Sequence, residues 1–319
     1  MDNPVAITLL VPCFNAAQHL PRLLEATKRQ TIPFHEIICY DDGSTDETVA
    51  IAKSYGAKVL QGTRNRGVAV ARNKLLEATS TNWVHFHDSD DLMADNFVEV
   101  MSNLAAKASP NQPIAFICGQ DEAKITPQTP YTAQLTYTNP HDFCALNTAD
   151  QPKFFIEKFV HLNTAIFPTK ALREVGGYCP YLRICEDVDM MVRLTAHGVR
   201  FQAIPDVLVT RVYHPSSLTK KTGSVERERY RLHYFNRCAK RLPSTYHPML
   251  GEIALFYARR FYWQGHITDA RRAIQLGKRC GVLLSKDTSR SHRLIAKVIG
   301  TEGLFWLLKR RSQLGRSST

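Results

Sequence analysis

The sequence predicts an α/β protein: a Rossmann-like, doubly wound, mostly parallel sheet followed by a helical C-terminal extension. Apolar, strand-like runs alternate with amphipathic helical stretches over the first 120 residues. The strand-like runs are continuously apolar, which is typical of parallel strands buried on both faces. From about residue 225, apolar residues recur at helical spacing among many arginines. We therefore expect one domain at 1–220 and a basic helical region at 221–319.

The expected elements follow a regular order along the chain. Strands are predicted at 5–12, 35–42, 57–62, 83–88 and 113–120, and helices at 17–30, 44–56, 67–79 and 95–107. Pro12 is expected to stop the first strand. Ser44 and Glu47 have the spacing of a capping box, and Gly56 is placed to end that helix. Further on, 227–242 is predicted as one helix and 249–280 as an antiparallel pair joined at 264–268.

The charge of the chain is concentrated in its last third. Residues 1–220 hold 20 Lys and Arg against 23 Asp and Glu, a net charge of −3, whereas 221–319 hold 21 against 6, a net charge of +15. The eight cysteines form no CxxC pair and several lie in apolar runs, which favours buried free thiols in a reducing compartment. No signal-peptide pattern opens the sequence, and no apolar run approaches the roughly 20 residues that span a bilayer. We expect a cytoplasmic protein.

Polar side chains follow three of the predicted strands, at Pro12–Asn15, Asp41–Ser44 and Asp88–Asp91. In parallel sheets, ligands bind beyond the carboxyl ends of the strands, so these groups are expected along one rim. The first strand is not followed by GxGxxG, and GxxxxGK[ST] does not occur. These absences argue against a dinucleotide dehydrogenase and a P-loop NTPase.

The stretch 85–91, HFHDSDD, crowds three carboxylates at the end of a strand. Like charges at this spacing repel, so the cluster is either a solvated turn that caps the next helix or a cation site. Asp88 and Asp90 are spaced to share one Mg²⁺ or Mn²⁺ and to leave positions open for a ligand. The second acidic strand end beside them favours the cation. The two histidines of the stretch are interpreted as structural.

Seven segments in one order carry a family resemblance. They are VPCFNAAQHL (11–20), DDGSTDET (41–48), NRGVAVARN (65–73), HDSDD (87–91), VGGY (175–178), CEDVDMMVRL (185–194) and RVYHPSSLT (211–219). Together they resemble the inverting glycosyltransferases of family 2, which have the GT-A fold, over roughly 1–220. The resemblance implies a bacterial-type enzyme of cell-surface polysaccharide synthesis. Such an enzyme moves a sugar from a nucleotide-diphosphate sugar, often a UDP-sugar, to an acceptor hydroxyl with inversion.

The resemblance places the nucleotide pocket at the ends of the first two strands. It assigns Pro12, Phe14 and Asn15 to this pocket, together with Asp42. An aromatic ring at position 14 suits stacking on a base, and a carboxylate at position 42 suits the uracil N–H. The alternative for Phe14 is packing in the core.

Further residues are assigned to the diphosphate and the metal. Gly67 would permit close backbone approach, and Arg72 is either a phosphate partner or a solvated helix residue. The resemblance implies that Asp88 lies nearer the ribose and that Asp90 is the direct ligand of Mg²⁺ or Mn²⁺. His214 would complete the metal shell or touch the diphosphate.

The segment 185–194 is expected to supply the general base. The resemblance assigns to Asp187 the removal of the proton from the acceptor hydroxyl. Glu186 would orient the acceptor or adjust the base. Asp189 lies two residues further on a helix and is read as structural. The alternative is that these acids only complement the positive end of a helix.

The basic C-terminal region ends in an amphipathic stretch. LFWLL at 304–308 is followed by Lys309, Arg310 and Arg311. Aromatic residues beside basic ones suit the surface of an anionic bilayer. Nucleic-acid binding is the competing use of such charge, but no nucleic-acid module is recognised, so none is expected. A solvated helical cap with no partner is the other alternative. We expect a saccharide or lipid-linked acceptor and a peripheral position at the inner face of the membrane.

Two other functions compete with sugar transfer. A non-catalytic nucleotide-binding or scaffold protein of the same fold would dock partners through the basic helices. A nucleotidyltransferase would share a related fold and acidic metal sites, but would need a loop for a triphosphate. No glycine-rich basic loop of that kind follows the first strand.

Overall fold

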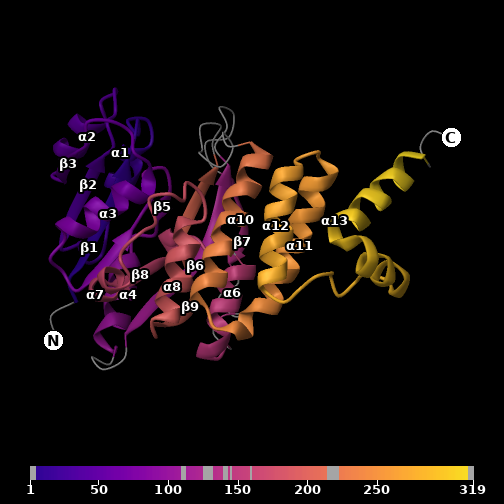
Figure 1. Ribbon diagram of the computed structural model, residues 1–319. Coiled ribbons are helices and arrows are strands. Elements are labelled where there is room, and N and C mark those ends of the chain that lie inside the picture. Colours follow the sequence, from indigo (N-terminus) through magenta and orange to yellow (C-terminus); the bar gives the residue numbers. More distant parts are fainter. Residues whose placement is uncertain are drawn as a thin grey trace. The chain divides into compact units, whose positions relative to one another are not determined.

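The computed structural model describes residues 5–108, 113–124, 132–138, 143, 146–158, 160–213 and 223–314. By its internal contacts the chain divides into two compact units, Met1–Lys221 and Thr222–Thr319. Figure 1 draws the first unit from indigo to salmon and the second from orange to yellow.

The first unit begins with the expected alternation of strands and helices (Figure 1). The elements are β1 (Ile7–Cys13), α1 (Leu20–Lys28), β2 (Glu36–Asp41), α2 (Thr48–Ser54), β3 (Lys58–Gln61), α3 (Val68–Ala78), β4 (Trp83–Phe86), β5 (Leu92–Met93), α4 (Phe97–Ala106) and β6 (Ile114–Lys124). The order predicted up to residue 120 is confirmed. The short strand β5 is added between β4 and α4.

The remainder of this unit completes the sheet and adds α8, the helix that begins at Glu186. The elements are β7 (Thr132–Thr138), η1 (Thr148–Asp150), α6 (Gln151–Glu157), η2 (Leu162–Thr164), β8 (Ala165–Pro168), α7 (Thr169–Glu174), α8 (Glu186–Ala196) and β9 (Arg200–Tyr213).

Within the described residues, nine strands form one sheet in the order β3-β2-β1-β4-β8-β6-β9-β5, with β7 paired to β6. β3, β2, β1 and β4 run parallel, as do β6 and β9. β8 is antiparallel to both β4 and β6, and β5 is antiparallel to β9. The α/β fold with a mostly parallel sheet is therefore confirmed, and its second half is mixed.

β1 is the central strand of the nucleotide-binding half. It pairs with β2 on one side and β4 on the other, and its residues from Ile7 to Val11 are all buried. Leu9 and Val11 belong to a cluster that includes Leu23 of α1 and Phe97 of α4. α3 packs against β1 and β2 without joining this cluster, so helices cover both faces of the strand. Burial on both faces explains why the run reads as continuously apolar.

Two local predictions about this half were wrong. β1 continues through Pro12, because pairing with β4 ends at Leu10 and the missing N–H has no partner to serve on that side. The capping box does not form: the Ser44 hydroxyl accepts the Asn15 N–H at 2.8 Å. The carboxylate of Asp46 accepts the Thr48 N–H at 3.1 Å at the start of α2 instead.

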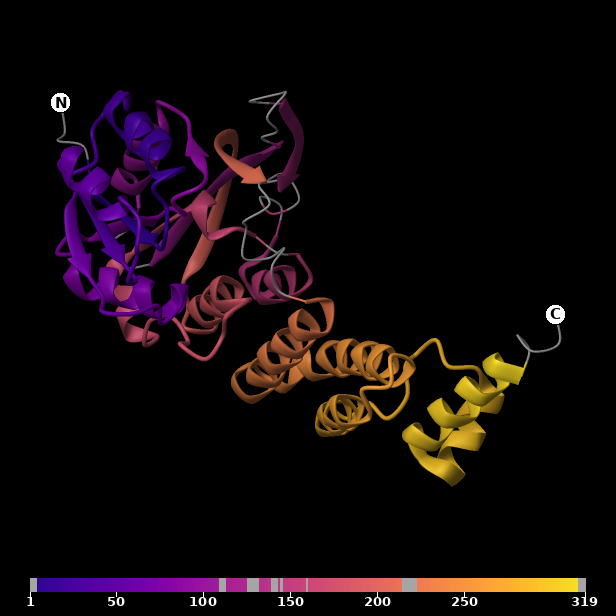
Figure 2. The same cartoon turned by 90° about the horizontal axis from the view of Figure 1, so that it is seen from above.

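The second unit is helical within its described residues. It comprises α10 (Ser224–Arg241), η3 (Ser244–Tyr246), α11 (His247–Trp263), α12 (Ile267–Arg279) and α13 (Arg290–Leu314). The predicted helix pair is confirmed as α11 and α12, which lie side by side in both views (Figures 1 and 2). Gly300 has φ 74° and breaks α13 into two segments, which Figure 2 shows in yellow. None of the described helices is both long and apolar enough to cross a membrane.

Candidate active site

The carboxyl ends of three parallel strands meet at one edge of the sheet. β1 lies between β2 and β4, and both pairings are parallel. The Asp42 N–H donates to the Cys13 carbonyl at 2.8 Å, and the His87 N–H donates to the Leu10 carbonyl at 3.0 Å. The segments after these strands, which carry Asn15, Asp42 and Asp88, therefore follow the same edge, as the sequence predicts.

The turn after β1 presents an aromatic ring. Phe14 is 47% exposed, so it does not pack in the core. Asn15 adopts φ 48° and its side-chain carbonyl accepts the Thr45 N–H at 2.9 Å. Together with the bond to Ser44, this ties the end of β1 to the loop after β2. Pro12 lies half-buried on β1, opposite Tyr40 of β2.

Asp42 holds the loop that leads into α3. Its Oδ2 accepts the backbone N–H groups of Arg66 at 2.8 Å and of Gly67 at 2.7 Å. Burial raises the pKa of Asp42 above its ordinary value, although these two bonds oppose the shift. Gly67 adopts φ 94°, and nothing lies within 4 Å of where its Cβ would be. The backbone conformation therefore requires glycine at this position, while close contact does not.

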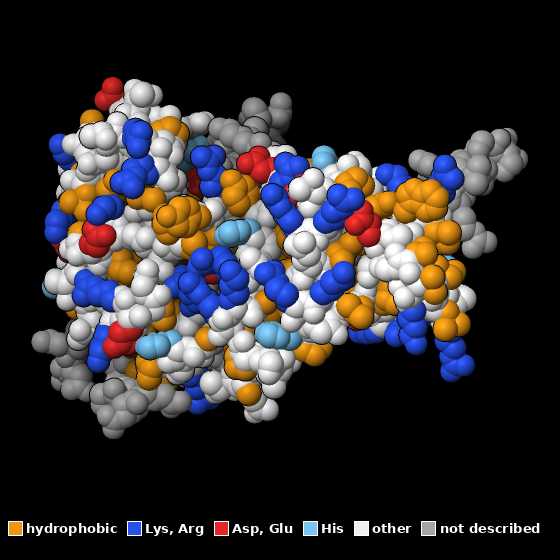
Figure 3. Space-filling model, in the orientation of Figure 1, with side chains coloured by type: hydrophobic (Ala, Val, Ile, Leu, Met, Phe, Trp, Pro, Cys, Tyr) orange, Lys and Arg blue, Asp and Glu red, His pale blue; other side chains and the backbone are white. Residues whose placement is uncertain are grey.

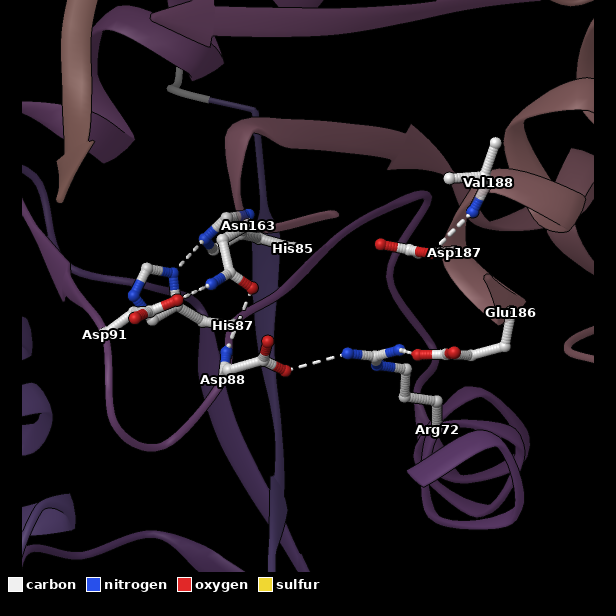
Figure 4. Close-up of polar contacts among 9 residues, drawn as sticks. All are labelled: Arg72, His85, His87, Asp88, Asp91, Asn163, Glu186, Asp187 and Val188. Carbon is white, nitrogen blue, oxygen red and sulfur yellow. Dashed lines mark hydrogen bonds and ion pairs between the residues drawn. The ribbon is translucent and has the colours of Figure 1, made fainter. Parts of the chain in front are cut away.

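The acidic loop after β4 is fixed by one buried asparagine (Figure 4). The Asp88 N–H donates to Oδ1 of Asn163 at 3.1 Å, and Nδ2 of Asn163 donates to Asp91. The other Asp91 oxygen accepts the Val212 N–H of β9 at 2.8 Å. Burial raises the pKa of Asp91 well above its usual range. Both carboxylate oxygens of Asp91 thus accept hydrogen bonds from the protein, whereas the side chains of Asp88 and Asp90 remain partly exposed.

The histidines of the loop are internal. His85 and His87 are fully buried and share a hydrogen bond of 3.0 Å, and His85 Nδ1 donates to the Ala165 carbonyl at 2.9 Å. Burial lowers the pKa of His85 well below its ordinary value and that of His87 to about 4. Both rings are neutral at pH 7 and support the strand end, in agreement with the structural interpretation.

Arg72 links the acidic loop to α8. It is 3% exposed, and its guanidinium donates to Oδ1 of Asp88 at 2.8 Å and to Oε1 of Glu186 at 2.7 Å (Figure 4). Its guanidinium carbon also lies 5.5 Å from the centre of the Tyr178 ring. Burial would raise the pKa of Asp88, but the charge and the hydrogen bond of Arg72, together with the nearby His87 and His161, outweigh burial and lower it. Arg72 is therefore not a solvated helix residue.

Two neighbouring carboxylates open α8. Glu186 is buried, and burial together with the Asp187 charge raises its pKa to about 7 although Arg72 opposes the shift. Asp187 is half-buried, and its Oδ1 accepts the Val188 N–H at 2.8 Å (Figure 4). Burial raises the pKa of Asp187 as well. Asp189 points elsewhere and pairs with Arg193 at 2.7 Å, in agreement with a structural role.

A reciprocal amide contact places α3 against the segment before α8. Asn73 Nδ2 donates to the Tyr178 carbonyl at 2.9 Å, and the Tyr178 N–H donates to Asn73 Oδ1 at 2.6 Å. A Cβ on Gly177 would lie 2.5 Å from Asn73 Oδ1, so the NRGVAVARN and VGGY segments fit only with glycine there. Sequence reasoning missed Asn73 and Asn163. The signal for Asn73 was its place beside Arg72, but no pattern marked Asn163.

The described residues suit a divalent cation only in part. In the part of the chain that the structure describes, no group of three or more His, Cys, Asp or Glu side chains is arranged to hold a metal ion. Asp88 and Asp90 lie on one loop with exposed oxygens, and the predicted third ligand, His214, lies outside the described residues. Magnesium sites at nucleotides commonly use one or two carboxylates plus substrate phosphates. The chemistry of this pair therefore fits Mg²⁺ or Mn²⁺.

A second positively charged side chain, that of Arg211, lies near the acidic loop. Arg211 of β9 donates from Nη1 to His161 Nε2 at 2.9 Å and to the Tyr213 hydroxyl at 3.3 Å. Tyr213 in turn donates to Glu122 of β6 at 2.5 Å. Burial, aided by the Arg211 charge, lowers the pKa of His161 to about 4, so this ring is neutral at pH 7. Arg211 thus brings positive charge to the strand that leads to His214.

Known proteins resemble the chain in sequence and fold. The model of the family described as Glycosyl transferase family 2 matches residues 8–175. An uncharacterized glycosyltransferase of Rickettsia typhi is 23% identical over 266 residues, which is 80% of this chain and 81% of that protein. Among solved structures, the mannosyltransferase PcManGT from Pyrobaculum calidifontis, in complex with GDP-Man and Mn²⁺, has a TM-score of 0.58 at 18% identity, covering 93% of this chain and 80% of that one. S. aureus TarS 1-349 in complex with UDP-GlcNAc has a TM-score of 0.56 at 15% identity, covering 90% and 95%.

Proposed function

Because the chain belongs to glycosyl transferase family 2, we propose that it is a metal-assisted, inverting glycosyltransferase of the hexosyltransferase type that uses a nucleotide-diphosphate sugar. The observation that carries this proposal is the convergence of the acidic loop and the α8 carboxylates on one buried arginine. Arg72 bonds Asp88 and Glu186 at once, which supports a single site with Asp88 on its proposed donor side and Glu186 on its proposed acceptor side.

The strand ends form the proposed donor pocket. Phe14 is exposed for stacking on a base beside Asn15 and Pro12. Asp42 uses one carboxylate oxygen for the loop at Gly67, and the structure gives its buried Oδ1 no hydrogen-bond partner among the described residues. An N–H such as that of uracil would satisfy this oxygen. Nucleotide sugars named with the similar structures, UDP-GlcNAc and GDP-Man, support this donor class, and we propose a UDP-sugar.

Asp90 and Asp88, with His214, are proposed to hold Mg²⁺ or Mn²⁺. A divalent cation there supplies Lewis-acid neutralisation of the leaving diphosphate when it is bound. Arg72 keeps Asp88 ionised and oriented, since it lowers the pKa of this carboxyl below the ordinary value. The bonds of Asn163 fix the backbone that carries both carboxylates.

Asp187 is proposed as the general base. As the acceptor oxygen attacks the anomeric carbon opposite the diphosphate, its proton passes to Asp187. The new C–O bond forms while the bond to the phosphate oxygen breaks, so the configuration inverts and a nucleoside diphosphate leaves. A raised pKa makes Asp187 a stronger base than an ordinary aspartate. Glu186, held by Arg72, positions the start of α8.

The two units have different proposed tasks. Residues 1–220 would carry out the transfer, and 221–319 would form a basic helical region at an anionic membrane surface. The acceptor is proposed to be a saccharide or lipid-linked saccharide of cell-envelope polysaccharide synthesis. We therefore propose that the protein lies at the inner face of the membrane.

A panel of nucleotide sugars tests the proposal. Binding and slow hydrolysis are measured with and without Mn²⁺ for the wild type, Asp90→Asn and the control Asp206→Asn, which changes an exposed aspartate on β9. We expect metal-dependent preference for one donor, lost in Asp90→Asn and retained in Asp206→Asn. Binding of no donor in the presence of metal would favour the scaffold function. Wild-type activity in Asp90→Asn would refute the metal assignment.

A further inference from the structure

The first segment of α13, residues 290–299, turns apolar side chains outward. Leu294 is 64% exposed and Val298 is 85% exposed, whereas Ala296 between them is buried. Gly300 ends this segment with a non-helical backbone. Exposed aliphatic side chains in a row on one helix are typical of a surface that contacts a membrane or another protein.

Basic side chains border this row. At four-residue spacing, Arg290, Leu294 and Val298 lie along one line of the helix, and Arg293 and Lys297 lie along the next. Arg293 donates to the Thr288 carbonyl at 2.8 Å, and a neutral carbonyl leaves its charge uncompensated. The segment contains no Asp or Glu. Its outer face is therefore both apolar and cationic.

The second segment of α13 continues the same pattern. Its inner side packs against the rest of the unit, since Phe305 is buried against the rings of Tyr262 and Trp263. Trp306 is instead 49% exposed, and the Arg310 guanidinium carbon lies 4.8 Å from its ring centre. Trp beside Arg is a pair that suits the headgroup layer of a bilayer.

Acidic side chains of this unit neutralise arginines of its other helices. Glu228 accepts from Arg260, Asp269 from Arg229 and Glu302 from Arg271. The surplus positive charge therefore includes the outer face of α13, in a region whose net charge is +15. Figure 3 shows hydrophobic side chains next to Lys and Arg over the segment that Figure 1 draws in yellow.

We propose that the outer face of α13 docks on an anionic lipid bilayer, with Leu294, Val298 and Trp306 in the interface and the basic side chains at the headgroups. This assigns a surface to the membrane contact of the proposed function and rests on that function only for its context. An anionic bilayer offers acyl chains to the exposed apolar side chains and negative headgroups to the basic ones. A second copy of the chain would bring the same positive charges together, and a nucleic acid would leave the aliphatic side chains without a partner.

Vesicle sedimentation of the full chain tests this surface. Vesicles of phosphatidylcholine alone are compared with vesicles that also contain phosphatidylglycerol, for the wild type and the double variant Leu294→Ser/Val298→Ser. The matched control is Phe256→Ser, which removes an apolar side chain of α11 that is 57% exposed. We expect binding only to the anionic vesicles, about tenfold weaker in the double variant and unchanged in the control.

Two further measurements keep the result decisive. Donor hydrolysis should be unchanged in the double variant, because the substituted residues lie outside the proposed active site, so failure of docking and failure of catalysis are separable. Absence of wild-type binding, or equal binding by the double variant, would overturn the docking surface. Light scattering that shows a wild-type dimer dissociated by the double substitution would also overturn it and assign the face to self-association.

Discussion

At the scale of single residues, the site depends on which side chains the protein already occupies. Asp91 is used by Asn163 and Val212, and Arg72 is used by Asp88 and Glu186. Fewer side chains keep a carboxylate oxygen or an aromatic ring available to a ligand. They include Phe14 by its exposure, Asp42 by its Oδ1 and Asp187 by its partial exposure. This distinction makes the assignments of donor pocket and base testable one by one.

Phe14 should matter for nucleotide binding and little for folding. Because its ring is 47% exposed, Phe14→Ala removes little buried surface. Stacking on a base contributes about 1–3 kcal/mol, so the affinity for UDP is expected to fall about tenfold or more. Calorimetric titration measures this, with Tyr181→Ala as the control because Tyr181 is 80% exposed. Equal UDP affinity in the two variants would remove Phe14 from the pocket.

Glu186 should leave a signature in the pH dependence of stability. Its pKa is raised to about 7 in the folded protein, so between about pH 4.5 and 7 the folded state binds more protons at this group than the unfolded chain. The free energy of unfolding should therefore fall as pH rises through this window, by at most about 1 kcal/mol per pH unit from this group alone. Glu186→Gln should lack this contribution.

Urea unfolding of the wild type and Glu186→Gln at a series of pH values measures the difference between their unfolding free energies. That difference should decline across the window and level off above it. Glu157→Gln, at an exposed glutamate, is the control and should follow the wild type. A difference that does not change with pH would mean that Glu186 titrates as it does in the unfolded chain.

At the scale of elements, the acidic loop is held by contacts from distant parts of the chain. Asn163 of η2 bonds both ends of the 88–91 segment, and Asp91 bonds the backbone of β9 two residues before His214. The acidic loop, η2 and β9 are thereby connected through buried hydrogen bonds. Loss of one member leaves other buried polar groups unpaired, which is costly.

Asn163→Ala should destabilise the first unit by about 1–3 kcal/mol, because buried groups of Asp88 and Asp91 lose their partner. The variant should also bind Mn²⁺ with UDP more weakly than the wild type. Asn96→Ala is the control, since Asn96 is exposed and makes no side-chain cap bond at α4. Urea unfolding and titration together measure both effects. Identical behaviour of the two variants would show that the Asn163 hydrogen bonds contribute neither to stability nor to Mn²⁺ binding.

The parallel half of the sheet and β6 were predictable, whereas the other strands of the mixed half were not. β1, β2 and β4 are buried on both faces, so they appear as apolar runs and their polar ends mark the site. β5 has two residues, and β8 has four between two short helices, so neither forms a periodic pattern. The hydrogen bonds of Asn163 join segments far apart in the sequence, and no local sequence pattern predicts the role of a single buried asparagine.

The same reasoning explains the errors at the strand ends. Ser44 and Glu47 have the right spacing for a capping box, but the end of β1 takes the Ser44 hydroxyl. A tertiary contact therefore overrides the local pattern. Arg72 was weighed as a phosphate partner or a solvated residue. Its burial between two carboxylates could not be read from spacing, because both partners come from other segments.

At the scale of the whole molecule, the chain consists of two compact units with separate chemistry. The strand ends and the acidic loop lie in Met1–Lys221, whereas Thr222–Thr319 carries a net charge of +14, from 20 Lys and Arg against 6 Asp and Glu. Each unit has buried apolar residues of its own, such as Leu9 and Phe97 in the first and Leu250 and Phe261 in the second. Units of this kind can respond separately to a ligand.

Binding of UDP with Mn²⁺ should therefore stabilise the first unit selectively. The tryptophans report the units separately: Trp83 belongs to the first, and Trp263 and Trp306 belong to the second. In Trp263→Phe/Trp306→Phe, the fluorescence melting midpoint should rise with ligand, since a ligand that binds only the folded form adds stability. In Trp83→Phe, the midpoint should stay constant. Equal shifts in both variants would mean that the units unfold together.

The anomeric configuration of the sugar released by slow donor hydrolysis tests the central claim most directly. With an α-linked UDP-sugar and Mn²⁺, NMR during the first turnovers should detect the β-anomer, because water attacks opposite the diphosphate with Asp187 as the base. Asp187→Asn should bind UDP normally and lose about a hundredfold or more of the hydrolysis rate. Release of the α-anomer first, or an unchanged rate in Asp187→Asn, would contradict an inverting transfer that depends on this carboxylate.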